Sequence, residues 1–212
     1  MADEEVVKAV TEALSSSKER KFVETVELSI NLKEVDLKNP KNRINEEIML
    51  PKGRGKELKI GIFASAELAE KSKGVVDLII MPEQIEDYVG DKPKARNMVN
   101  SIDFFLAEAP LMPTIGKSLG TVLGPRGKMP RPVPPNLDPS GMVKNLKNTV
   151  RIKSKDRRTF HIPVGVKTMK PEDLAANIEA VLVRVESKLE RGRYNIHSAY
   201  IKTTMGPAVK VI

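Results

Sequence analysis

The middle of the chain alternates short apolar runs with more polar segments, and this alternation constrains the fold more than any other feature. Helical segments are expected at 67–73 and 83–89. Continuous apolar strands that alternate with helices predict βαβ units and a parallel sheet. Three mostly apolar runs are the expected strands: LKIGIF at 58–63, VVDLIIM at 75–81 and IDFFLA at 102–107.

The beginning of the chain follows a different pattern. Residues 4–14 form an apolar-periodic segment that predicts an amphipathic helix. Residues 26–32 alternate apolar and polar side chains, as expected of a strand with one buried face. We interpret residues 44–50 as a second strand, paired antiparallel with the first.

The end of the chain returns to this pattern. Two strands, at 149–153 and 159–164, flank a charged segment and predict a hairpin. A long helix is expected from Pro171, because proline and acidic residues favour a helix start. Gly192 is expected to end it, and strands follow at 198–203 and 208–212.

The two patterns together predict an α/β and α+β protein of two domains. The chain is expected to leave the first domain, build the second and then return. The expected bounds are 1–53 with 149–212 for a discontinuous α+β domain, and 54–148 for an inserted α/β domain.

The segment 51–56 (PKGRGK) is the best candidate for a linker, since it holds two glycines and a proline. The chain then crosses between the domains twice. Two adjacent crossings make a hinge, which we place at Gly53, Gly55 and Asn148.

Residues 115–135 begin as an apolar-periodic helix that breaks at Gly124 and Pro125. The Gly- and Pro-rich loop that follows has a defined shape because these residues restrict or direct the backbone. Its cations make it a candidate surface for a polyanion. From this stretch alone, a solvated connector is an equally supported interpretation.

Positive charge is concentrated in one part of the chain. The net charge is +8, and residues 117–158 contain eleven Lys and Arg against two Asp. This block favours a nucleic-acid partner over general solubility, with a solvated basic face as the alternative. Residues expected to make secondary basic contacts are Arg126, Lys128, Arg131, Lys153, Lys155, Arg157 and Arg158.

Composition excludes several classes of protein. The chain has no cysteine, which excludes disulfides and thiol chemistry and fits a reducing cytoplasm. No apolar run is long enough to cross a membrane. The first ten residues are acidic and lack the apolar core of a secretory signal, so no membrane partner is expected.

The sequence offers no catalytic, metal or cofactor site. Gly116, Lys117 and Ser118 resemble the end of a phosphate-binding loop, but Leu111 stands where that loop needs glycine. His161 and His197 are the only histidines, and without cysteine they do not make a structural zinc site. Two alternatives remain open: an enzyme that binds a nucleotide in the α/β domain, and a protein scaffold.

Two further features favour RNA. Phe22, beside Lys21, is expected near a strand edge and partly exposed, because Glu24 interrupts the apolar alternation. Residues 203–207 (TTMGP) offer hydroxyl and backbone groups at a tight turn, which can bind 2′-hydroxyl and phosphate groups. Taken alone, this second segment is more often only a turn.

Four motifs in order resemble the L1 family of large-subunit ribosomal proteins over essentially the whole chain. They are KF-x-x-TVE at 21–27, LGPRGKMP at 123–130, HIPVG at 161–165 and TTMGP at 203–207. The resemblance implies an RRM-like split βαβ domain with an inserted Rossmann-like α/β domain. The short N-terminal segment resembles the archaeal type.

The resemblance also implies a function. Members bind the large-subunit rRNA of the mobile stalk near the tRNA exit site and help release deacylated tRNA. The same surface in this family binds the protein's own mRNA and represses translation. A cytoplasmic, ribosomal location and a monomeric free protein are therefore expected, with rRNA, mRNA, exit-site tRNA and the large subunit as partners.

The RNA-contacting residues of the family fall on specific positions of this chain. Many relatives have lysine directly after PVG, whereas this chain has Val166 and then Lys167, so the role of Lys167 stays open. The implied RNA contacts are Lys21, Phe22, Thr25, Glu27, His161, Gly165, Lys167, Ser198, Thr204, Met205 and Gly206.

Overall fold

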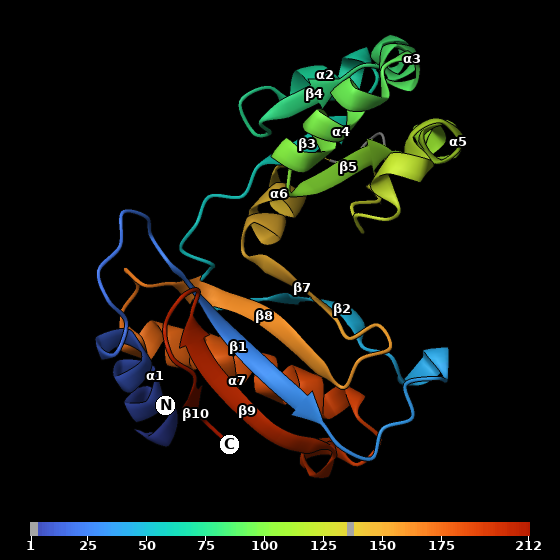
Figure 1. Ribbon diagram of the computed structural model, residues 1–212. Helices are drawn as coiled ribbons and strands as arrows, with labels where there is room; N and C mark the ends of the chain where they lie inside the picture. The colour runs from blue at the N-terminus through green and yellow to red at the C-terminus, as the bar shows by residue number, and fades with distance from the viewer. Residues whose placement is uncertain (1–3, 135–137) are drawn as a thin grey trace. The chain divides into compact units, whose positions relative to one another are not determined.

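The computed structural model describes residues 4–134 and 138–212 and has a mixed α/β fold with parallel and antiparallel sheets (Figure 1). Pro135, the last residue of the Gly- and Pro-rich loop, lies outside the described residues. The chain divides into two compact units. Unit 1 is Met1–Lys56 with Asn148–Ile212, and unit 2 is Glu57–Lys147.

The main sheet of unit 1 is antiparallel, with strand order β10-β9-β1-β8. Strand β1 lies between β8 and β9, so the N-terminal segment pairs on both sides with C-terminal segments. The bounds are Thr25–Leu32 for β1, Thr159–Val166 for β8, Ile196–Thr203 for β9 and Val209–Lys210 for β10.

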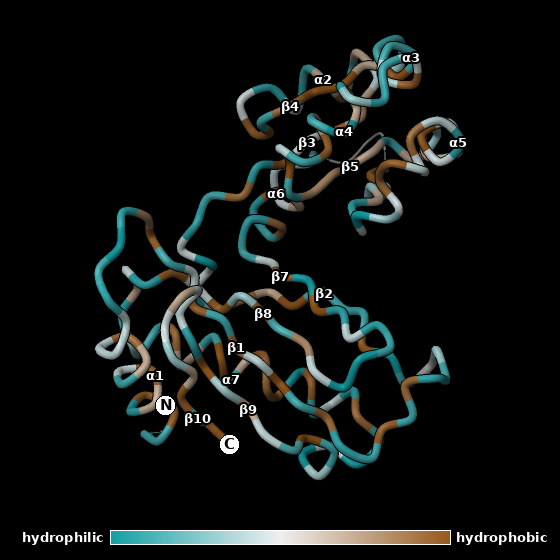
Figure 2. The backbone as a smooth tube through the Cα atoms, viewed as in Figure 1, coloured by the Kyte–Doolittle hydropathy of each residue, from teal (hydrophilic) through white to brown (hydrophobic). Residues whose placement is uncertain are grey.

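Two helices of unit 1 cover one face of this sheet (Figure 1). They are α1, Glu4–Ser15, and α7, Pro171–Lys188. Side chains of β1 alternate between buried and half-buried, and the buried set packs with both helices in one apolar core. Hydropathy accordingly changes from residue to residue along β1 and β9 (Figure 2). The opposite face carries no helix among the described residues of unit 1.

Strands β2 (Asn45–Met49) and β7 (Thr149–Lys153) form a separate antiparallel ribbon. The expected pairing of residues 26–32 with 44–50 is therefore wrong. Glu47 lies opposite Arg151, and the two form a hydrogen-bonded ion pair of 2.6 Å. This cross-strand pair, together with burial of Ile48 against the core, favours the β2–β7 register.

The expected hairpin of 149–153 with 159–164 is also wrong. The turn exists, because the Arg157 N–H donates to the Ser154 carbonyl at 3.1 Å. Its two strands nevertheless pair with different partners, β7 with β2 and β8 with β1. Beyond the turn, the C-terminal helix α7 ends at Lys188, and Gly192 begins a short 3₁₀ helix, Gly192–Asn195, rather than ending α7.

Unit 2 contains a parallel sheet of order β4-β3-β5-β6, as its apolar strands predict. Apolar clusters lie on both faces of the sheet: Phe63 of β3 joins one, and Ile60 and Ile62 join the other. The strands are β3 (Ile60–Phe63), β4 (Leu78–Ile80), β5 (Phe104–Glu108) and β6 (Arg131–Val133).

The helices of unit 2 are α2 (Ala66–Ser72), α3 (Pro82–Gly90), α4 (Lys92–Ser101), α5 (Met112–Leu123) and α6 (Ser140–Lys147). Sequence reasoning missed α4, which buries only Ala95, Met98 and Val99 and so has a weak periodic signal. It also missed β6, a three-residue strand inside the Gly- and Pro-rich loop. Pro132 fits there because β6 is an edge strand.

Candidate nucleic-acid interface

Segments from opposite ends of the sequence meet where β1 begins and β9 ends. The Thr204 N–H donates to the Thr25 carbonyl at 3.0 Å, and the Thr25 N–H donates to Thr204 Oγ1 at 3.1 Å. Thr204 Oγ1 also donates to the Thr25 carbonyl at 3.2 Å. Two expected RNA contacts, 179 residues apart in sequence, are thus held together by three hydrogen bonds.

Large apolar side chains are exposed beside this junction. Phe22 is 53% exposed and Met205 is 59% exposed, and Val23 between Phe22 and Glu24 is 61% exposed. The prediction that Phe22 is partly exposed is confirmed. Exposed apolar groups surrounded by polar ones mark interaction sites, and an exposed ring can stack on an unpaired base.

The uncovered face of the sheet extends this surface along β1. The register places Glu27 opposite Pro163 and Lys202, while Ser29 lies opposite His161. Glu27, His161 and Ser198, which the family resemblance assigns to RNA, therefore share one face, on which His161 is exposed, Glu27 half-buried and Ser198 buried. Their acceptor and donor groups can bind 2′-hydroxyl and base groups rather than only phosphate.

Asn31 links three strands on this face. Its Nδ2 donates to Ser198 Oγ at 2.9 Å, and Thr159 Oγ1 donates to its Oδ1 at 2.7 Å. Because Ser198 Oγ accepts from Asn31, the hydroxyl proton of Ser198 remains able to donate away from Asn31.

Two glycines implied by the family resemblance have packing roles in the structure. Gly165 is buried, and a Cβ there would collide with the Leu174 side chain of α7 and lie 2.8 Å from Met169 Sδ. A Cβ on Gly206 would collide with Thr203 Oγ1. Gly165 therefore allows β8 to pack closely against α7 and Met169.

Lys167, whose role the sequence left open, is engaged inside unit 1. Its Nζ donates to the carbonyl oxygens of Ser17 at 3.1 Å and Lys18 at 3.3 Å. The same Nζ lies 3.9 Å from Glu24 Oε2. The ammonium group thus connects the end of α1 to the start of β1.

Glu24 is a residue of this site that sequence reasoning did not select. It is 1% exposed, and its Oε1 accepts from the Met205 N–H at 2.9 Å and from Thr203 Oγ1 at 3.4 Å. The available signal was a charged residue at an apolar position of the alternating strand pattern. Sequence reasoning used that signal only to place Phe22 near an edge.

The expected secondary basic residues fall into two groups. Lys153, Lys155, Arg157 and Arg158 are exposed around the β7–β8 turn of unit 1. This turn lies at the far end of β1 from Phe22, because the Leu32 N–H donates to the Arg158 carbonyl at 2.9 Å. Seven residue steps along β1 correspond to about 23 Å.

The second group, in unit 2, is largely committed to internal contacts. Lys128 Nζ donates to the carbonyl oxygens of Val99 and Ile102, at 2.8 and 2.5 Å. Burial lowers the pKa of Lys128 from its ordinary value, and nearby Asp103 opposes that shift. Arg131 lies half-buried in β6.

Arg126 has a similar role, because its Nε donates to Asn100 Oδ1 at 2.9 Å and its Nη1 to the Val122 carbonyl at 3.2 Å. Gly127 has a φ of +65°, a conformation that favours glycine. Arg126 and Lys128 together attach the LGPRGKMP loop to α4, which gives this basic loop a structural role.

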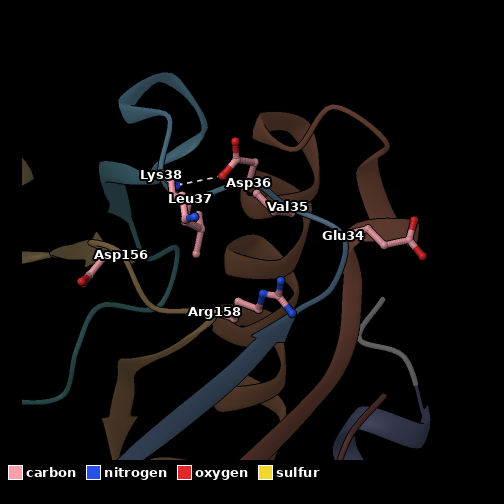
Figure 3. A pocket seen from close by; sticks show the side chains of 7 residues that line it. All are labelled: Glu34, Val35, Asp36, Leu37, Lys38, Asp156 and Arg158. Atoms are coloured by element: carbon pink, nitrogen blue, oxygen red, sulfur yellow. Dashed lines mark hydrogen bonds between the residues drawn. The ribbon is translucent and has the colours of Figure 1, made fainter.

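A hollow of about 440 Å³ lies at the Leu32 end of β1 (Figure 3). Arg158 lines it together with the loop that follows β1. Three carboxylates line the hollow together with two cationic residues, so its electrostatic potential is not uniformly positive and does not favour phosphate. The lining residues are Glu34, Val35, Asp36, Leu37, Lys38, Asp156 and Arg158.

The linker is attached to unit 1. Gly53 and Gly55 have φ values of +68° and +69°, and the Asn177 side chain donates to the Gly53 carbonyl at 2.8 Å. The Leu50 N–H donates to the Asn148 carbonyl at 2.8 Å, which joins the two crossing segments. Gly53 lies beside Asn148, since a Cβ on Gly53 would be 3.0 Å from Asn148 Oδ1, and all three expected hinge residues belong to unit 1.

Metal and membrane sites have no support in the described parts of the chain. Across residues 4–134 and 138–212, His, Asp and Glu form no group of three or more suited to a metal ion. In the same ranges no helix combines the length and apolar character needed to cross a membrane.

Comparison with known proteins gives consistent matches along the whole chain. Residues 13–207 match the sequence profile of the Ribosomal protein L1p/L10e family. The chain is 51% identical to large ribosomal subunit protein uL1 of Methanocella arvoryzae, over all of both chains. It is 54% identical to uL1 of Thermoplasma acidophilum, over 98% of this chain and 95% of the relative. Identity to uL1 of Archaeoglobus fulgidus is 48%, over 99% and 98%.

Proposed function

Because the chain belongs to the Ribosomal protein L1p/L10e family, and is of the archaeal uL1 type, we propose that it binds the large-subunit rRNA of the mobile stalk near the tRNA exit site. As a family member it is a structural constituent of the large ribosomal subunit and not an enzyme. Its location is accordingly the cytoplasmic ribosome.

We assign RNA recognition to unit 1. Strands β8 and β9 flank β1, and α7 connects them across one face of the sheet. This order supports an RRM-like split βαβ domain whose uncovered face binds RNA. In unit 2, the sheet order β4-β3-β5-β6 with helices between its strands supports a Rossmann-like inserted domain.

The observation that carries the proposal is the junction of Thr25 with Thr204. It places exposed Phe22 and Met205 beside a polar sheet face. An exposed ring beside a face with hydroxyl groups suits RNA that has unpaired bases and 2′-hydroxyls. Lys21, which is also exposed, adds a cation for phosphate.

The same surface would serve the other proposed roles. We propose that the chain also binds its own mRNA there and represses translation, so that rRNA and mRNA compete. On the ribosome, movement at the Gly53, Gly55 and Asn148 linker would help deacylated tRNA leave the exit site. The free protein is proposed to be a monomer.

The test is binding to three RNAs over a range of salt concentrations: a stalk rRNA fragment, the leader of the protein's own mRNA and an unrelated RNA of equal length. We expect the rRNA fragment to bind most tightly, the leader less tightly and the unrelated RNA only at low salt. Equal affinity for all three RNAs at every salt concentration would contradict the proposal.

A further inference from the structure

We infer that Glu24 and Lys167 position the RNA-contacting turn without touching RNA themselves. This inference rests on the proposed function, because it concerns how unit 1 presents Thr204 and Met205. The buried carboxylate of Glu24 holds the turn, and the ammonium group of Lys167 compensates the charge of that carboxylate.

Glu24 fixes the turn at two points through one oxygen. Its Oε1 accepts from the Met205 N–H at 2.9 Å and from Thr203 Oγ1 at 3.4 Å. With the carboxylate 1% exposed, it cannot meet an RNA group from solvent. Hydrogen bonds to a charged acceptor are about twice as strong as neutral ones, so this carboxylate is well suited to define the turn.

The second oxygen of Glu24 explains why a cation is needed. Oε2 is buried and accepts no hydrogen bond from any residue that the structure describes. Two cations lie near the carboxylate: Lys167 Nζ is 3.9 Å from Oε2, and Arg20 Nε is 3.8 Å from Oε1. A buried carboxylate is costly unless it is compensated in this way.

Lys167 is held where it can compensate Glu24. Its Nζ donates to two carbonyl oxygens, those of Ser17 and Lys18, and its side chain is 28% exposed. Those carbonyls lie two and three residues beyond the end of α1. Ser17 Cβ also lies 3.3 Å from where a Cβ on Gly206 would be, so the segment that binds Lys167 also packs against the turn.

This arrangement separates positioning from phosphate contact. A lysine that contacts phosphate changes the salt dependence of binding, since each lost contact lowers the slope by about 0.7–0.9. A lysine that only compensates Glu24 leaves that slope unchanged. Loss of such a lysine should weaken RNA binding when Glu24 is present and should have little effect when Glu24 is replaced by glutamine.

The experiment measures affinity of the full chain for the stalk rRNA fragment at several salt concentrations, using Glu24→Gln, Lys167→Met and the double variant. Glu19→Gln and Lys170→Met, two exposed residues of the same unit, are matched controls. We expect each single variant to bind about tenfold more weakly with an unchanged salt slope. In the Glu24→Gln background, Lys167→Met should cost less than about threefold.

Hydrogen exchange provides a readout that needs no RNA. The Met205 amide should exchange faster in Glu24→Ala than in the wild type, while amides in the centre of β9 keep their protection. Unchanged protection of Met205 in a folded variant would overturn the role of Glu24.

The remaining outcomes separate this inference from the proposed function. If Lys167→Met costs the same in both backgrounds and lowers the salt slope, Lys167 contacts phosphate and the inference is wrong. Wild-type preference for the stalk RNA together with wild-type affinity of Glu24→Gln also overturns it. Absence of that preference in the wild type contradicts the proposed function instead. If Glu24→Gln fails to fold, the salt slope of Lys167→Met decides.

Discussion

Single hydrogen bonds at the Thr25–Thr204 junction define the candidate interface at the residue scale. Thr204 supplies both an acceptor for the Thr25 N–H and a donor to the Thr25 carbonyl. Met205 is 59% exposed, and its backbone N–H donates to Glu24. A change of the Met205 side chain should therefore affect RNA binding more than folding, whereas a change at Thr204 should affect both.

We expect Thr204→Ala to lower the free energy of unfolding by about 1 kcal/mol, because the Thr25 N–H loses its acceptor, and to weaken specific RNA binding because the Thr25–Thr204 junction is then held less firmly. Met205→Asp should weaken it further, since the new carboxylate would face phosphate. Urea unfolding should be close to wild type for Met205→Asp. Val183→Asp, at a 66% exposed position on α7, is the control that should keep wild-type affinity. Wild-type affinity of both interface variants would remove these residues from the site.

The internal hydrogen bonds that sequence reasoning missed, those of Glu24 and Lys128, share a cause. Glu24 and Lys128 are charged, and sequence rules assign charged side chains to the surface. Each is instead bonded to groups that the fold brings near, Glu24 to Met205 and Lys128 to Val99. Such partners depend on tertiary structure, so local patterns do not predict them. The exposure of Phe22 was predictable because Glu24 interrupts the apolar alternation that would otherwise place Phe22 on the buried face.

At the element scale, α7 is attached to the β2–β7 ribbon by a charged cluster. Glu46 of β2 forms ion pairs with Arg184 at 2.9 Å and Lys188 at 2.5 Å. A hydrogen bond from Lys188 is the main cause that holds the pKa of Glu46 below its ordinary value of 4.5, and burial opposes it.

A lowered folded-state pKa makes the stability contribution of Glu46 dependent on pH. The contribution is complete above about 4.5 and is lost as the pH falls through the lower folded value. We expect Glu46→Gln to be less stable than wild type at pH 7, with a difference that shrinks towards pH 3. Urea unfolding across this range measures it, with Glu19→Gln as control. A difference that does not change with pH would exclude the charge as its source.

The β7–β8 turn is the exposed basic element of unit 1. We expect Lys155→Ala and Arg157→Ala each to lower the salt slope of RNA binding by roughly 0.7–0.9 if the turn contacts phosphate, with little change in preference among RNAs. Salt titrations with the stalk fragment measure this. Lys8→Ala, on α1, should leave the slope unchanged. A wild-type slope in both turn variants would place that turn in solvent.

Element types were more predictable than strand partners. Apolar runs such as IGIF in β3 predict buried parallel strands, because a strand that is covered on both faces is apolar along its whole length. The pairing of β7 was not predictable, because its neighbour in sequence, β8, is an equally good strand. Register and side-chain pairs such as Glu47 with Arg151 decide between such partners. The short edge strand β6 gave no periodic signal at all.

At the scale of the whole molecule, the chain builds unit 1 from both of its ends and unit 2 from its middle. The alternating middle and the return of strand patterns after residue 149 made a two-domain organisation a reasonable expectation. The geometry of the candidate site depends on pairing between β1 and β9, which only the tertiary structure provides.

The central position of β1 has a consequence for synthesis of the protein. Phe22 leaves the translating ribosome early, and Thr204 follows about 180 residues later. The residues of unit 2 lie between them in sequence, so unit 2 has been synthesised before Phe22 and Thr204 can come together. A nascent chain that stops before Ile196 has neither β9 nor the turn, and so presents half of an interface. On the proposed function, such a truncated product would bind the stalk RNA more weakly than the full chain.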